Sequence, residues 1–292
     1  MDFQWYPGHM TKAKRMMQES MKLIDIMIEL VDARIPLSSR NPDIDQLAAG
    51  KYRLILLNKY DMACLLYTSD MADDQVTAEW EKYFKAKGFF VAKTNSKSGK
   101  GVKATQNIIL EACREKLERD RRRGIKNRPI RAMIAGIPNV GKSTFINSLA
   151  GRACTKTGNK PGVTKGKQWI KLNKNIELLD TPGILWPKFE DQTVGLRLAL
   201  IGSIRDEILN QDEMAIELIE YLKHHYSGIL EKRYQVDESE DRVKILNAIA
   251  ENRNCRMKGN ELDYEKAAKI LLEEFRNGKL GRISLEVPGE EA

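Results

Sequence analysis

Residues 136–143, GIPNVGKS, combine residue types that bind phosphate: two glycines separated by four residues, then a lysine and a hydroxyl side chain. Glycines let backbone N–H groups turn toward phosphate oxygens, and the start of the following helix adds a positive dipole. Lys142 would neutralise the outer phosphates, and the Ser143 hydroxyl would bind Mg²⁺. A glycine turn with a purely structural role is the alternative. The nucleotide-binding residues predicted from this loop are Asn139, Val140, Gly141, Lys142, Ser143 and Thr144.

A second motif, NKYD at residues 58–61, follows the apolar run 54–57. A carboxylate such as Asp61 can accept hydrogen bonds from both N1–H and the exocyclic amine of guanine, whereas adenine offers no such pair of donors. Four residues alone are a weak signal, but after a buried strand in a chain with a phosphate loop they predict guanine recognition. The residues expected to contact the base are Asn58, Lys59 and Asp61, together with Asn95 and Ser96 in the small polar loop 94–99.

Two further loops carry residues that would respond to the γ-phosphate of GTP. Thr164 stands in the Gly- and Pro-bearing loop 160–166, from which it could reach both Mg²⁺ and the γ-phosphate. In DTPG at 180–183, Asp180 would hold Mg²⁺ through water, and the Gly183 amide would contact the γ-phosphate. The predicted Mg²⁺ ligands are Ser143, Thr164 and Asp180, and the predicted catalytic residues of these motifs are Lys142, Thr164 and Gly183.

The elements that position these motifs alternate between strand-like and helix-like patterns as far as residue 186. Apolar runs predict strands near 24–31, 54–57, 89–92, 131–135, 168–172 and 176–179, and amphipathic patterns predict helices near 11–23, 75–87 and 102–117. After residue 187 the patterns are helical, at 193–202, 212–226, 241–250 and 264–275. We therefore expect an α/β domain over 1–186 with a mostly parallel sheet, a linker at 187–204 and an all-α C-terminal domain at 205–292.

The order of the motifs indicates a circular permutation. A GTPase normally has its phosphate loop and its two switch loops before the NKxD motif and the second base-contacting loop, but here the last two come first. The usual ends would be joined through the Arg-rich segment around 102–130, which leaves the site intact because the same strands can still assemble. The helical domain would then follow the second switch directly, so loss of the γ-phosphate should change its orientation.

Composition favours a polyanionic partner and an intracellular location. The net charge is +8, and the four cysteines show neither Cys-x-x-Cys spacing nor pairing with histidine. Neither an apolar run long enough to cross a membrane nor a leader-like N-terminus is evident, so we expect a cytoplasmic protein without a membrane partner. Loop 253–259 and a basic run are candidate contacts for a polyanion such as RNA, although such a run is usually a solvated surface. The run comprises Arg114, Lys116, Arg119, Arg121, Arg122, Arg123, Lys126, Arg128 and Arg131.

The chain resembles the circularly permuted bacterial GTPases of the YlqF family. The resemblance rests on WYPGHM at 5–10, DARIP at 32–36, DTPGILWP at 180–187 and the helical tail. It implies GTP and GDP as ligands with Mg²⁺, and a role as a GTP-hydrolysing assembly factor that acts as a nucleotide-dependent switch on rRNA. The implied partners are the large ribosomal subunit precursor, its rRNA and its ribosomal proteins, with a monomer off the ribosome.

Hydrolysis raises a question, because many GTPases orient the attacking water with a glutamine just after the second-switch glycine, and here that residue is Ile184. His9 is our candidate to position the water, from its chemistry and the Pro-Gly-His segment of the family; a surface histidine is the alternative. Asn139 is a candidate K⁺ ligand by the same resemblance, against a loop-stabilising role. The other functional hypothesis is an RNA-binding scaffold that holds GTP as a structural ligand with negligible hydrolysis.

Residues 62–70 depart from the family pattern directly after Asp61. Removing nine residues here would join NKYDMA smoothly to the helix predicted near 75–87. The inserted string resembles the translation of a transposon-end adapter used in sequencing libraries, so we hypothesise a sequence artefact; an ordinary loop insertion is the alternative. Recovery of the same nine residues from source DNA by an adapter-free method would refute the artefact, and nucleotide affinity with and without them would show whether they disturb the base pocket.

Overall fold

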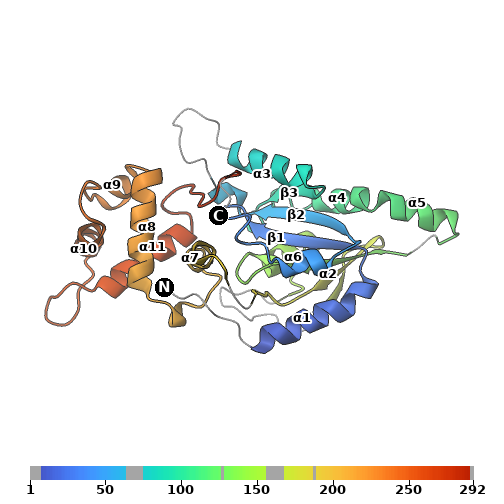
Figure 1. Ribbon diagram of the computed structural model, residues 1–292, viewed down its shortest axis with the longest axis horizontal. Helices are drawn as coiled ribbons and strands as arrows, with labels where there is room; N and C mark the ends of the chain where they lie inside the picture. The colour runs from blue at the N-terminus through green and yellow to red at the C-terminus, as the bar shows by residue number, and fades with distance from the viewer. Residues whose placement is uncertain (1–7, 64–74, 126–127, 156–167, 187–188, 290–292) are drawn as a thin grey trace.

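The computed structural model describes residues 8–63, 75–125, 128–155, 168–186 and 189–289. A six-stranded sheet has the order β3-β2-β1-β4-β6-β5, in which all neighbours are parallel except β5 and β6. Figure 1 shows this sheet with its helices at one end of the molecule and a group of helices at the other. The strands are β1 (Ile26–Asp32), β2 (Tyr52–Asn58), β3 (Phe90–Thr94), β4 (Ile130–Ala135), β5 (Gln168–Lys171) and β6 (Ile176–Asp180).

The central strands are apolar on both faces because helices cover both. All seven residues of β1 are buried, as expected of a central strand in a parallel sheet. Side chains alternate between faces along β2: Leu54 and Leu56 join the larger hydrophobic core, whereas Ile55 and Leu57 join a smaller one. The helices of this half are α1 (Gly8–Ser20), α2 (Asp43–Leu47), α3 (Gln75–Ala86), α4 (Thr105–Ala112), α5 (Arg114–Arg122) and α6 (Lys142–Ala150), with 3₁₀ turns η1 (Met21–Leu23) and η2 (Tyr60–Met62).

Parallel strands bring the ends of distant sequence segments to one edge of the sheet. Asp32 at the end of β1 is paired in register with Asn58 at the end of β2, and Asn58 with Thr94 at the end of β3. On the other side of β1, Ile134 of β4 is in register with Asp180 of β6. The loops that follow these strands include every motif that the sequence analysis assigned to the base and to the second switch, as well as the phosphate loop.

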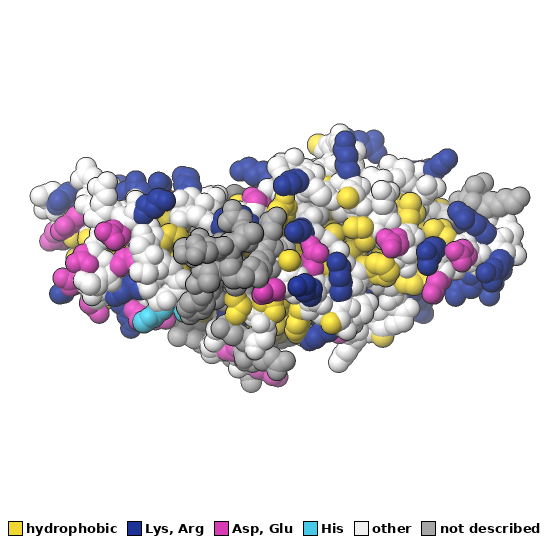
Figure 2. Space-filling view, turned by 90° about the horizontal axis from the view of Figure 1, so that it is seen from above, with side chains coloured by type: hydrophobic (Ala, Val, Ile, Leu, Met, Phe, Trp, Pro, Cys, Tyr) yellow, Lys and Arg dark blue, Asp and Glu magenta, His cyan; other side chains and the backbone are white. Residues whose placement is uncertain are grey.

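The Arg-rich connection is partly a structural element. The single helix expected over 102–117 is two helices, α4 and α5, separated at Cys113. Lys116 is buried in ion pairs with Asp120 and with Asp25, the residue before β1, and Arg128 lies 3.5 Å from the same Asp25 carboxylate. These residues therefore attach the connection to the sheet. Lys and Arg side chains gather on the surface at the α5 end of the molecule (Figure 2), and the exposed ones on and just after α5 are Arg114, Arg119, Arg121, Arg122 and Arg123.

The second half is helical, as predicted, and four of its helices, α7, α8, α10 and α11, begin at a polar side-chain cap. Asn210 accepts hydrogen bonds from the backbone N–H groups of Asp212 and Glu213, and Asp263 accepts one from Lys266. Part of the expected linker is itself a helix, α7, which packs against α8. The elements of this half are α7 (Gln192–Leu200), η3 (Asp206–Ile208), α8 (Gln211–His225), α9 (Ile229–Tyr234), α10 (Arg242–Asn252) and α11 (Tyr264–Arg276).

The segment after α11 returns to the sheet-containing half. The backbone N–H of Ile283 donates to the Met62 carbonyl at 2.8 Å, and that of Leu285 donates to the Arg34 carbonyl at 2.9 Å. Glu286 is buried, and its carboxylate accepts hydrogen bonds from the backbone N–H groups of Leu37 and Ser38. Residues 283–286, which we call the returning tail, thus pack against the loops that follow β1 and β2.

Candidate nucleotide-binding site

The phosphate loop between β4 and α6 has a backbone that glycine makes possible. Gly141 has φ 101°, in the left-handed region that side chains with a Cβ rarely adopt, and it directly precedes α6. A Cβ on Gly136 would lie 2.6 Å from the Leu30 carbonyl oxygen, so this glycine allows the loop to pass close to β1. The N-terminal N–H groups of α6 therefore face the space after the sheet edge, where a phosphate would bind.

Lys142 is buried in the first turn of α6, and its ammonium group is held by the loop. Its Nζ donates to the carbonyl oxygens of Gly136 and Ile137 at 3.0 and 3.2 Å. Burial lowers the pKa of Lys142 to about 8, against the opposing effect of Asp180. A phosphate in the loop would add negative charge beside this ammonium group and would stabilise its protonated form.

Asp180 is a suitable ligand for a divalent cation. Its side chain is fully buried, and neither carboxylate oxygen has a hydrogen-bond partner among the residues that the structure describes. Burial raises the pKa of Asp180, partly offset by Lys142. Because an unpartnered buried carboxylate is costly, these oxygens fit Mg²⁺ or its bound water, with the Ser143 hydroxyl in the first turn of α6 as the second predicted ligand.

Asn58 connects the base-recognition loops to the phosphate loop. Its Nδ2 donates to the Val140 carbonyl at 2.8 Å. Its Oδ1 accepts from the Ser96 backbone N–H at 3.1 Å, the Ser96 hydroxyl at 2.7 Å and the Thr94 hydroxyl at 3.3 Å. The sequence motif suggested that Asn58 acts on the nucleotide, but in this geometry its amide joins three loops to one another.

Lys59, Asp61 and Asn95 are three of the residues that the sequence predicts to contact the base. Lys59 has φ 57°, and its Nζ donates to the Asn139 carbonyl of the phosphate loop at 3.1 Å. Asp61 is exposed in η2, where its carboxylate is accessible to a ligand. Asn95 accepts from the backbone N–H groups of Lys97 and Ser98 and so shapes the second base-contacting loop.

The loop after β6 lies against the phosphate loop. A Cβ on Gly183 would lie 2.9 Å from Pro138 and 3.0 Å from Lys142 Nζ, so glycine permits this close approach. Ile184 is buried in the hydrophobic core. The position that carries glutamine in many GTPases therefore contributes to packing, and a water-positioning group must come from elsewhere.

Two predicted catalytic residues are not placed by the structure. Thr164 lies outside the described residues. His9 belongs to the first turn of α1, but its side chain is outside the described part. Both remain predictions.

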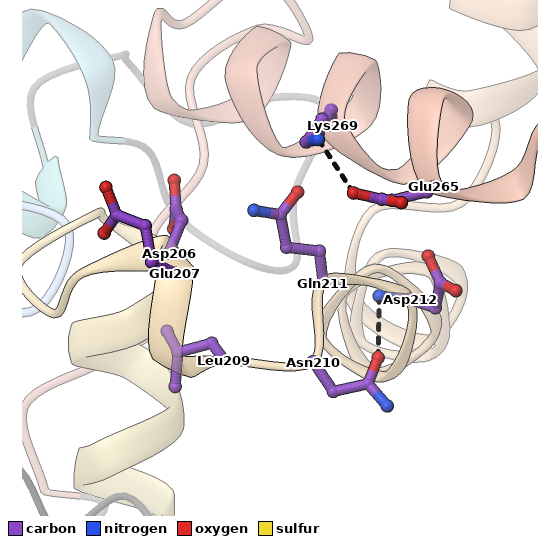
Figure 3. Close-up of a pocket in the computed structure, with 8 residues that line it drawn as sticks. All are labelled: Asp206, Glu207, Leu209, Asn210, Gln211, Asp212, Glu265 and Lys269. Carbon is purple, nitrogen blue, oxygen red and sulfur yellow. Dashed lines mark hydrogen bonds and ion pairs between the residues drawn. The ribbon is translucent and has the colours of Figure 1, made fainter.

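A hollow of about 620 Å³ lies in the helical half, away from these motifs (Figure 3). Its lining includes Asp206, Asp212 and Glu265, and Glu265 is paired with Lys269 at 2.8 Å. Its acidic character is unsuited to phosphate, so this hollow is not a candidate for the nucleotide-binding site.

Comparison with known proteins agrees with the motifs. Residues 131–251 match the family described as "50S ribosome-binding GTPase". Ribosome biogenesis GTPase A of Bacillus cereus is 50% identical over 291 residues, which cover 99% of this chain and 95% of the relative. That of Priestia megaterium is 48% identical, with 99% and 98% covered. The chain belongs to the YlqF family of ribosome biogenesis GTPases.

Solved structures support the same assignment of this YlqF-family chain. Its fold is similar to a GDP-bound YlqF, with a TM-score of 0.65, 26% identity, and 94% of this chain and 99% of the other covered. GNP-bound YlqF of Thermotoga maritima gives a TM-score of 0.63 at 27% identity, with 96% and 100% covered. The YlqF-family protein is therefore a GTPase with a circularly permuted P-loop domain followed by a helical region, and it binds guanine nucleotides.

Asp32 also belongs to this site of the YlqF-family chain, although its motif did not predict that. Asp32 Oδ2 accepts a hydrogen bond from Lys59 Nζ at 2.8 Å. A signal was available, because Asp32 ends an apolar run just as Asn58 does, and parallel neighbours end at the same edge. The sequence pattern alone does not show that β1 and β2 are neighbours in the sheet.

No helix among the described residues combines the length and the apolar character that crossing a membrane requires.

Proposed function

We propose that this GTPase is an assembly factor for the large ribosomal subunit and acts as a nucleotide-dependent switch on rRNA. The proposal rests on the phosphate loop, the NKYD loop and the DTPG loop, which all lie at one edge of the sheet. The phosphate loop also contacts the helical half, because Asn139 Nδ2 donates to the Gly202 carbonyl at 2.6 Å. The relatives' name, ribosome biogenesis GTPase A, and the family description "50S ribosome-binding GTPase" support the large subunit as partner.

The residues predicted to bind the phosphates, Mg²⁺ and the guanine base each have a role in this proposal, apart from Asn58 and Lys59, whose side chains join loops to one another. Lys142, Ser143 and the N–H groups of 139–144 would hold the phosphates, and Ser143, Thr164 and Asp180 would hold Mg²⁺. When bound, Mg²⁺ would supply positive charge that neutralises the phosphates. Asp61, together with Asn95 and Ser96, selects guanine. The Gly183 amide senses the γ-phosphate, and its close packing on Pro138 transmits a change there to the phosphate loop.

The polyanion-binding surfaces that we propose are the exposed arginines of α5 and the loop 253–259. Three residues of the basic run are less available to a polyanion, because they pair with acidic residues of the protein. Lys116 and Arg128 pair with Asp25, and Arg131 lies 3.3 Å from Glu177. In the second surface, Arg256 and Lys258 are exposed. We propose a GTPase domain at 1–186 and a helical, RNA-binding domain at 205–292, with α7 in the linker between them. We also propose that the protein is cytoplasmic and is monomeric when it is not bound to the ribosome.

Adding large ribosomal subunits is expected to accelerate phosphate release from GTP, because the chain places Ile184 in its core and so lacks a glutamine at that position. Release should be slow for the protein alone and should rise with subunit concentration until it saturates. Small subunits at the same concentration are the control. Negligible release in both cases, with GTP still bound, would favour the RNA-binding scaffold instead.

Replacing His9 with alanine is expected to lower subunit-stimulated hydrolysis by about 10²-fold, the lower end for one proton-transferring or water-positioning group. GDP affinity should stay unchanged, because His9 lies outside the phosphate and guanine motifs. His225→Ala, on α8, is the control. Stimulated hydrolysis that survives His9→Ala would remove His9 from the mechanism.

Asn139 leaves two roles open, K⁺ binding and support of the loop. Its φ of 58° and its hydrogen bond to Gly202 support the second role, and its place beside the phosphates supports the first. If Asn139 helps to bind K⁺, hydrolysis should be faster in KCl than in NaCl at matched ionic strength, since the bound cation adds positive charge near the phosphates. Equal rates in the two salts would leave only the supporting role.

A further inference from the structure

Two cations share the buried carboxylate of Asp32. Its oxygens accept from Arg34 Nε and Nη2, both at 2.9 Å, and from Lys59 Nζ at 2.8 Å. The Asp32 and Arg34 side chains are 0% and 1% exposed. Although burial alone would raise the pKa of Asp32, the two cations hold it well below its usual range. Asp32 is therefore held as a carboxylate by direct contacts with both cations.

On one side, this carboxylate positions the lysine of the guanine-recognition motif. Lys59 Nζ bridges Asp32 Oδ2 and the Asn139 carbonyl of the phosphate loop. A lysine side chain is otherwise flexible, and fixing both contacts selects one conformation of its stem. Asp32 thereby holds the NKYD loop and the phosphate loop at a fixed separation.

On the other side, Arg34 reaches the helical half. Its Nη1 donates to the Phe275 carbonyl of α11 at 3.4 Å, and its guanidinium group lies 5.3 Å from the centre of the Phe275 ring. The Arg34 carbonyl also accepts from Leu285 of the returning tail. A second connection of the same kind joins Ile283 to Met62, the residue after Asp61.

We propose that Asp32 and Arg34 are positioning residues for guanine-nucleotide binding, and that they couple nucleotide affinity to the docking of α11. These contacts lie beside the NKYD loop, which is expected to bind the base, and not beside the DTPG loop, which is expected to bind the γ-phosphate. Because GDP and GTP share the base, the coupling acts on both nucleotides alike. It differs from the γ-phosphate switch, which distinguishes the two nucleotides. Because such coupling is reciprocal, guanine nucleotide should also stabilise the docked α11.

Phe275→Leu tests the coupling from the distant side, because it keeps an apolar side chain but removes the ring beneath Arg34. We expect the Kd for GDP, measured by calorimetry on the full chain, to rise by a factor within about 5 to 150, the usual range of coupling between sites. The Kd for a non-hydrolysable GTP analogue should rise by the same factor. Ile249→Val, a comparable loss in the buried core of α10, should change both by less than about twofold.

Arg34→Lys supplies a second, independent variant. Lysine keeps a charge beside Asp32 but loses the two-pronged contact and the stacking on Phe275. If both variants break the same contact, the one between Arg34 and Phe275, their effects should not add. The double variant Arg34→Lys with Phe275→Leu should then bind GDP no more weakly than the weaker-binding single variant. GDP should slow amide exchange in α11 of the unsubstituted chain and not of Arg34→Lys.

The proposal is overturned if Phe275→Leu affects GDP affinity no more than Ile249→Val does, or if the effects of the two single variants simply add. A rise in Kd for the GTP analogue alone would also overturn it, because that result indicates γ-phosphate sensing. Should Phe275→Leu fail to fold, Arg34→Lys and its exchange measurement decide alone. These assays use nucleotide without ribosomes, so their outcome is independent of the large-subunit proposal.

Discussion

Asp61→Asn should change the base preference of the site from guanine to xanthine. The carboxylate of Asp61 would accept two hydrogen bonds from guanine, each worth roughly 1.5–3 kcal/mol when the acceptor is charged, so GDP affinity should fall by about 10²- to 10⁴-fold. The asparagine amide can donate to the 2-carbonyl of xanthine, and its oxygen can accept from xanthine N1–H. Binding of XDP should therefore become tighter as that of GDP weakens.

The measurement is the Kd of each nucleotide for both proteins. Asp61 is exposed, so the substitution should leave the fold intact. Glu118→Gln, at an exposed position on α5, makes the same change in net charge and should leave both affinities unchanged. Unaltered GDP binding by Asp61→Asn would mean that another residue recognises the base.

Lys142→Met should reduce GTP hydrolysis by about 10³-fold, because it removes a buried positive charge from the developing negative charge on the phosphates. Single-turnover phosphate release is the measurement. Lys103→Met, at an exposed position, should retain full activity. Hydrolysis that persists in Lys142→Met at more than a tenth of the original rate would exclude the assigned role.

The same substitution should have a pH-dependent effect on the stability of the nucleotide-free protein. The pKa of Lys142 is about 8 in the folded protein, whereas the ordinary pKa of a lysine is 10.5, so burying its charge costs about 3 kcal/mol below pH 8. Between pH 8 and 10.5 the folded protein loses this proton while the unfolded chain keeps it, so the penalty disappears as pH rises. The gain in unfolding free energy from Lys142→Met should therefore be largest below pH 8 and fall toward zero near 10.5.

Chemical denaturation across this pH range checks the prediction. Loss of the hydrogen bonds to Gly136 and Ile137 will lower the gain but not its dependence on pH, and Lys103→Met should show no such dependence. A difference that is constant from pH 7 to 10.5 would mean that Lys142 is not destabilised by burial.

Much of the site could be predicted because its residues directly follow apolar strands. Asn58, Gly136 and Asp180 each follow or end such a run, and parallel strands place these ends together whatever the order of the motifs in the chain. The contact of Asp32 with Lys59 could not be predicted in this way, because no local sequence pattern shows that β1 and β2 are neighbouring strands. The contact of Arg34 with Phe275 spans 241 positions and depends on how two halves pack.

The basic run shows the opposite case, because its pattern of charges did not reveal which of its side chains are exposed. Lys116 belongs to a row of arginines and lysines typical of an RNA-binding surface, but its ammonium group is buried beside Asp25 and Asp120. Charge along a sequence does not reveal which side of a helix faces an acidic residue far away. Arg119 and Arg121, on the same helix, are exposed as expected.

The returning tail has a consequence for the order in which the protein is made. Residues 283–286 are synthesised long after the loops following β1 and β2, yet Ile283 and Leu285 complete the hydrogen bonding of Met62 and Arg34. A nascent chain folds from its N-terminal end, so its sheet can form while these partners are still missing. The chain would acquire these last contacts beside its guanine-recognition loop only after residues 283–286 had left the ribosome, and a nascent chain shorter than that would carry the loop without them.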